Sequence, residues 1–230
     1  IGTVGSGVEW ATPAGRVELP QADLWLSPLR PTELRLDLPP GATFDDGYGA
    51  QIQSLAATEA RLRLRPLAGA ELASFALHSG PLTLGNEPLA QGIDMQARLA
   101  EAGSYDVTLT LHDLAPAALA GPLPLPGALN LDAKGRVWLD RPPSPQTMTP
   151  ETVPLPVGLR LDAAELRLGR LSARILGDIR ADAQGRAEGQ IAVYTRDSRP
   201  IIEAAAKAGL IPSKAAILAT TMLRNLSELP

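Results

Sequence analysis

The chain has 230 residues, of which 45% are hydrophobic, 20% are charged and only 3% are aromatic, and its formal net charge is −4. A core made from these residues is mainly aliphatic. The negative charge argues against nucleic acid as a general partner, because phosphate binding requires a basic surface. The chain contains no cysteine, which excludes disulfides, zinc–thiolate sites and thiol catalysis.

Apolar and polar residues alternate along much of the chain, the period expected of a strand with one buried face. The alternation is clear in the segments 33–38, 60–65, 105–113, 128–133, 136–140, 158–163 and 165–169, and weaker in 17–26, 75–79, 93–99 and 189–194. One buried face and one solvated face are typical of antiparallel sheets. The sequence therefore predicts a large, curved antiparallel sheet.

Two nearly identical pentapeptides, DAKGR at 132–136 and DAQGR at 182–186, interrupt this alternation. An aspartate carboxylate can accept hydrogen bonds from nearby backbone N–H groups, and a glycine can adopt the positive φ that closes a short loop. Both pentapeptides therefore predict a turn between two strands, over 128–140 and 175–194. We expect the sheet to be assembled from repeated hairpins.

Prolines are frequent in 115–127 and 141–156, so neither segment can be an interior strand. The second segment is either a loop within one continuous sheet or a linker between sub-units 1–140 and 157–230. We favour the loop, and hence a single β-rich domain over 1–230.

The pattern changes after Pro200. A short helix ends near Gly209 and Pro212, and Ser213 begins a second helix. The second helix has one apolar stripe, formed by Ala215, Leu218, Ala219, Met222 and Leu226. We expect a helical hairpin over 198–228, packed on the apolar face of the sheet, and thus an α+β fold that is mainly β.

Few residues suggest chemistry. His78 and His112 are the only histidines, and no G-x-S-x-G or H-E-x-x-H motif is present. Both histidines are predicted to be surface residues, although a hydrolase site around His112 and Asp113 remains an alternative. We expect no catalytic residue, no metal site and no cofactor.

Two sets of residues are candidates for binding. The apolar set consists of Leu34, Leu36, Leu62, Leu64, Leu109, Leu111, Leu159, Leu161, Leu218 and Met222. The basic set, Arg61, Arg63 and Arg65, could contact anionic lipid headgroups, although acidic neighbours favour charge pairing between strands on a solvated face.

Several segments resemble known envelope proteins. Strings such as LNLDAKGRVWL and IRADAQGRAEGQIAV are similar to AsmA/TamB-like proteins, and ATPAGRVEL, LRLDAAELRLG and IIEAAAKAGLIP resemble an uncharacterised alphaproteobacterial family with an N-terminal membrane anchor. The resemblance implies a periplasmic protein tethered to the inner membrane. Ile1 is not preceded by a methionine, so we expect that an anchor or signal peptide was removed.

The expected function is therefore non-enzymatic. One hypothesis is that the protein binds or handles a phospholipid or another apolar ligand on an aliphatic sheet face. The alternative is a structural or interaction module that docks another envelope protein through its sheet edges or its arginine rows.

Overall fold

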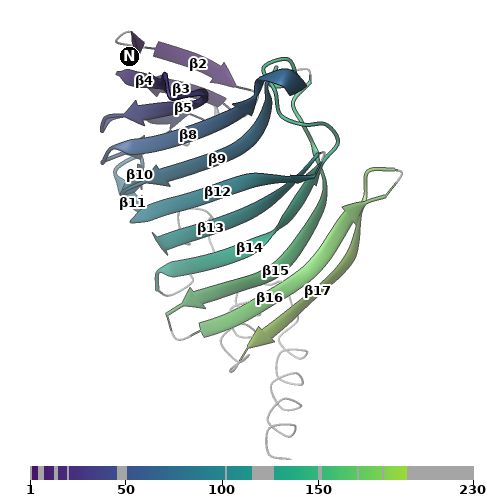
Figure 1. The fold of residues 1–230 in the computed structure, drawn as a ribbon. Helices are drawn as coiled ribbons and strands as arrows, with labels where there is room; N and C mark the ends of the chain where they lie inside the picture. Colours follow the sequence, from purple (N-terminus) through teal and green to yellow (C-terminus); the bar gives the residue numbers. More distant parts are fainter. Residues whose placement is uncertain are drawn as a thin grey trace, which may run out of the picture.

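The computed structural model describes residues 2–4, 8–12, 15–19, 21–45, 51–101, 103–115, 127–149, 152–169, 171–182 and 184–195. These residues form two antiparallel sheets, one of eleven strands and one of six, here called the large sheet and the small sheet. Figure 1 shows the large sheet as a curved, twisted layer. The twist follows from the right-handed twist of each strand.

The strands of the large sheet, in spatial order, are β1 (Gly2–Val4), β4 (Ala22–Ser27), β5 (Arg30–Leu38), β8 (Thr58–Arg65), β9 (Glu71–Ser79), β12 (Gly92–Glu101), β13 (Ser104–Leu114), β14 (Leu129–Leu139), β15 (Pro156–Leu168), β16 (Leu171–Ala181) and β17 (Ala187–Thr195). Those of the small sheet are β2 (Val8–Thr12), β3 (Gly15–Leu19), β6 (Thr43–Asp45), β7 (Gln51–Ser54), β10 (Leu82–Leu84) and β11 (Glu87–Ala90). A 3₁₀ turn, η1 (Pro66–Ala68), joins β8 to β9.

The small sheet is a continuation of the large sheet across a bend. The order β2-β3-β6-β7-β10-β11 matches the order β1-β4-β5-β8-β9-β12, and each strand of one set is joined in sequence to its counterpart in the other. Prolines such as Pro39 and Pro81 lie at the bend, where their missing N–H interrupts the ladder. Gly80 also lies there, and a Cβ on it would come within 2.8 Å of the Ala56 Cβ.

The bend closes a small hydrophobic core. Leu89, Ala90 and Leu114 are buried there. Small-sheet residues Ile52, Leu82 and Leu84 and large-sheet residues Leu111 and Leu129 pack against them. The small sheet therefore folds toward the face of the large sheet that carries Leu111.

The predicted α+β fold is wrong for the described part of the chain, which contains no α-helix and has two sheets rather than one. The helical hairpin expected at 198–228 lies outside the described residues. No helix among the described residues is long and apolar enough to cross a membrane. Residues 141–156 join β14 to β15, which pair with each other along most of their length.

The two similar pentapeptides have different structures. DAQGR forms the predicted turn between β16 and β17: the Asp182 carboxylate accepts hydrogen bonds from the backbone N–H groups of Gln184 and Arg186, at 2.9 and 2.8 Å, and Gly185 has a φ of +77°. DAKGR lies in the middle of β14, so the hairpin predicted over 128–140 is wrong. Larger apolar residues, Leu131 and Val137, flank DAKGR and continue the strand, whereas alanines flank DAQGR.

This difference makes the two aspartates a matched pair. We expect Asp182→Ala to increase the hydrogen-exchange rates of the β17 amides several-fold, because the turn loses its main acceptor. Asp132→Ala, at the equivalent position of DAKGR, removes only a 3.1 Å bond from the Thr110 hydroxyl and should leave exchange in β14 unchanged. If the two substitutions changed exchange in their own strands equally, Asp182 would not be the residue that holds the β16–β17 turn.

Candidate functional site

One face of the large sheet is continuously apolar, and we call it the aliphatic face. Ten apolar residues, one on each of ten described strands, form a row in which each residue is directly opposite the next. They are Leu24, Leu36, Ala60, Leu77, Met95, Leu109, Ala133, Ala164, Ile175 and Val193. Residues that are directly opposite in an antiparallel ladder point to the same side of the sheet. The period-two pattern of each strand thus becomes one surface.

The structure brings together the leucines that the sequence selected. Leu34, Leu36, Leu62, Leu64, Leu109, Leu111, Leu159 and Leu161 all lie on the aliphatic face. The other two predicted residues, Leu218 and Met222, lie outside the described part of the chain. None of the eight leucines is buried: seven are half-buried, and Leu159 is 38% exposed.

Across the middle of this face the buried residues are alanines, whereas the large buried residues Leu114, Leu168 and Tyr105 lie at its two ends. Ala60, Ala97, Ala164 and Ala173 are each at most 9% exposed, whereas their larger neighbours remain in contact with solvent. A closed core would show the opposite pattern, with the large aliphatic side chains buried most completely. In the part of the chain that the structure describes, the middle of the aliphatic face is therefore an extended apolar surface rather than the interior of a packed domain.

Both ends of this face are bounded. At the end near the bend, the small sheet packs against Leu111 and Leu129. At the other end, the segment after β14 crosses the ends of β13 and β12 to reach β9, where the Leu72 N–H donates to the Pro143 carbonyl at 2.8 Å. Tyr105 is buried at this end and donates its hydroxyl proton to the Leu72 carbonyl, also at 2.8 Å.

A shallow hollow of about 360 Å³ lies at the β14–β17 side of the sheet. Val137, Leu159 and Ile179, which belong to the aliphatic face, contribute to its lining together with Val157 and Ala187. It is large enough for part of a small apolar ligand, since typical ligand pockets begin near 300 Å³.

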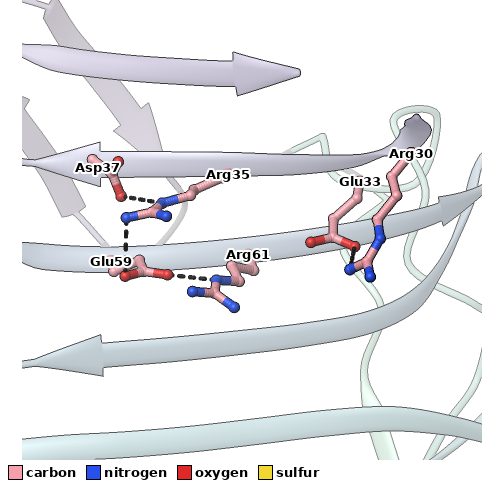
Figure 2. A network of polar contacts seen from close by, with 6 residues as sticks. All are labelled: Arg30, Glu33, Arg35, Asp37, Glu59 and Arg61. Atoms are coloured by element: carbon pink, nitrogen blue, oxygen red, sulfur yellow. Dashed lines mark hydrogen bonds and ion pairs between the residues drawn. The ribbon is translucent and has the colours of Figure 1, made fainter. Parts of the chain in front are cut away.

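The opposite face of the large sheet is polar, and its charges are largely paired. Figure 2 shows Arg35 bound to Asp37 at 2.9 Å and to Glu59 at 3.3 Å, and Arg61 bound to the same glutamate at 2.5 Å. Exposed pairs of this kind contribute little stability individually. Their main consequence is that the arginine rows carry little uncompensated positive charge.

The arginines predicted to contact headgroups lie on this polar face. Arg61 is paired with Glu59 and Arg65 with Glu71 at 3.5 Å, whereas no ion pair of Arg63 is found among the described residues. The sheet itself separates all three from the eight leucines. Headgroup binding by these arginines stays a prediction, and the headgroup would then lie on the polar face.

The polar face also holds a charged cluster that the sequence did not reveal. The guanidinium groups of Arg160 and Arg180 both lie over the Trp138 ring, 5.9 and 5.8 Å from its centroid. Nearby, Arg136 hydrogen-bonds to Asp106 at 2.7 Å and lowers the pKa of that carboxyl group. The only feature that points to this cluster is the pairing of β14 with β15. In that pairing Gly158 is opposite Trp138 and leaves room for its ring.

The two histidines converge on one carboxylate. His78 Nδ1 is 2.6 Å from one oxygen of Asp94, and His112 Nε2 is 3.6 Å from the other. Asp113 does not form the dyad with His112 that a hydrolase site would need, because it exchanges hydrogen bonds with Asn130 instead. In the part of the chain that the structure describes, no group of three or more candidate ligands could hold a metal ion.

Comparison with known proteins gives a family but no function. No curated protein and no solved structure matches the chain. The expected likeness to AsmA/TamB-like proteins and the restriction to alphaproteobacteria thus find no support, whereas membership of an uncharacterised bacterial family is confirmed. A family model described as "Uncharacterized protein conserved in bacteria (DUF2125)" matches residues 6–230, and the chain therefore belongs to this family.

Proposed function

We propose that the protein is a non-enzymatic module that binds the acyl chain of a lipid on its aliphatic face. The observation that carries the proposal is the row of half-exposed leucines on a continuous apolar surface. Soluble proteins rarely expose an apolar patch of this extent unless it binds something. A periplasmic location with an inner-membrane anchor belongs to the same proposal and is supported only by the sequence resemblance.

The dimensions of the face suit an acyl chain. Ten strands at a spacing of about 4.8 Å span about 43 Å across the sheet. An acyl chain in a bilayer leaflet occupies half of a hydrocarbon core of about 30 Å, or about 15 Å. The face is therefore longer than one chain, and each methylene group removed from water contributes about 0.8 kcal/mol.

Binding can be tested with a polyene fatty acid whose fluorescence increases in apolar surroundings. We expect saturable binding by the wild-type protein and an affinity about tenfold weaker for Leu159→Glu, since a carboxylate on the face opposes an apolar ligand by about 1.4 kcal/mol or more. Leu67→Glu is the control, because Leu67 lies fully exposed in η1, away from the face.

Native mass spectrometry of protein purified gently from a bacterial envelope provides a second measurement. We expect adducts of phospholipid mass that disappear after organic extraction. A clean protein mass together with no fatty-acid binding would overturn the proposal, as would equal affinities for wild type and Leu159→Glu.

A further inference from the structure

The large sheet ends in a long exposed edge at β17. All nine residues of β17 pair with β16, and none of the described strands lies on its outer side. Eight of the nine residues are exposed, and Ile191 and Val193 on the aliphatic face are 58% and 55% exposed. From Ala187 to Tyr194, the outward backbone groups have no partner among the described residues. Such a row beside exposed apolar side chains is a template for another strand.

The other edges are short or met by a neighbour. Within the described residues, β1 has three residues and β2 has five. The edge of β11 is met by the end of β13, where the Ala115 N–H donates to the Leu89 carbonyl at 2.7 Å. By contrast, β17 has none of the lysines, prolines or bulges that usually protect an edge, and Glu188 is its only charged residue.

We propose that β17 pairs antiparallel with β17 of a second copy of this chain, about a two-fold axis at Ala192. In this register Ile191 lies opposite Val193 of the second copy, and Gln190 lies opposite its Tyr194. Within β17, no charged residue faces another. The two Glu188 side chains are eight residues apart along the pair, about 27 Å, which is beyond the Debye length at physiological salt.

A second copy fits this edge because the strand is self-complementary. An isologous contact buries the same surface on both partners and closes after two subunits. Opposite residues in an antiparallel pair share a face, so Ile191 and Val193 of both copies come together on one side. The two aliphatic faces then form one continuous surface, although the pairing itself does not depend on lipid binding.

The absence of cysteine from the chain allows a sharp test. Ala192→Cys introduces a single thiol on the proposed axis, where directly opposite Cα atoms lie about 4.5–5.5 Å apart, within disulfide range. We expect mild oxidation to give a covalent dimer in high yield. Leu67→Cys, an exposed thiol away from the edge, should give little. Equal yields from the two variants would overturn the proposal.

Sedimentation equilibrium of the unmodified protein provides an independent measurement. We expect the mass of two chains at micromolar concentration, and the mass of one chain for the double variant Ile191→Lys/Val193→Lys, in which four ammonium groups would meet at the contact. The matched control Leu67→Lys should remain dimeric. A monomeric wild type, or a double variant that still dimerises, would refute pairing through β17 even if a different protein were found to bind this edge.

Discussion

Replacing Gly135 with valine is expected to destabilise the protein by about 3 kcal/mol, the upper end of the usual cost of overpacking. Gly135 lies inside β14, which pairs with β13 and β15 on both sides. A Cβ atom at this position would overlap the carbonyl oxygen of Arg160 and lie 3.2 Å from the Leu161 Cα. Both are backbone atoms, so no side-chain rotation relieves the clash.

The prediction is checked by urea denaturation, with Gly158→Val as the matched control. The nearest atom to a Cβ on Gly158 is a side-chain carbon of Trp138, at 3.2 Å, which can move. Neither glycine has a positive φ, so the comparison isolates the close approach of two backbones. Equal midpoints for Gly135→Val and the wild-type protein would show that β14 and β15 do not pair in this register.

Gly135 also shows why a short motif did not determine the local structure. In DAKGR the glycine permits two strands to approach closely beside a bulge, at Asp162, whereas in DAQGR Gly185 closes a turn through its positive φ. Both uses exploit the missing side chain. The pentapeptide alone does not distinguish them; the larger flanking residues of DAKGR could have done so.

The large sheet was predictable because its strands are long enough to show their period. β5, β8 and β13 have eight to eleven residues and alternate clearly. The strands of the small sheet have three to five residues, which is too short for a pattern to stand out. The bend between the two sheets was not predictable either. It requires neighbouring strands to bend at aligned positions, which the sequence of a single strand does not show.

The candidate site was likewise predictable only in part. Alternation selected the eight leucines and assigned them to one face, because a period of two fixes the side of the sheet. Their half-exposed state depends on what packs against the face, which periodicity does not report. The meeting of His78 and His112 at Asp94 depends on the register of three strands, and no local signal encodes it.

Tyr105→Ala is expected to cost about 3–5 kcal/mol, the range for removing a buried aromatic side chain. Tyr105 is 4% exposed, and its hydroxyl group bonds to the carbonyl of Leu72, whose N–H bonds in turn to Pro143. The substitution therefore leaves a cavity and loosens the contact between β9 and the segment after β14. Tyr105→Phe keeps the ring and should cost only about 1 kcal/mol.

Alkaline pH provides a readout that separates the hydroxyl group from the ring. Burial, followed by the charge of Glu71, raises the pKa of Tyr105 above its ordinary value of about 10. Above a pH of about 10 the unfolded chain releases this proton more readily than the folded chain does. The unfolding free energy therefore falls as the pH rises toward the pKa of the folded state. We expect the unfolding free energy of the wild-type protein to fall more between pH 9 and about 11 than that of Tyr105→Phe. Tyr194→Ala is the control: Tyr194 is 61% exposed, so this variant should keep the pH dependence that Tyr105 causes. Identical slopes for wild type and Tyr105→Phe would mean that the hydroxyl group is solvated and that the contact with Leu72 does not form.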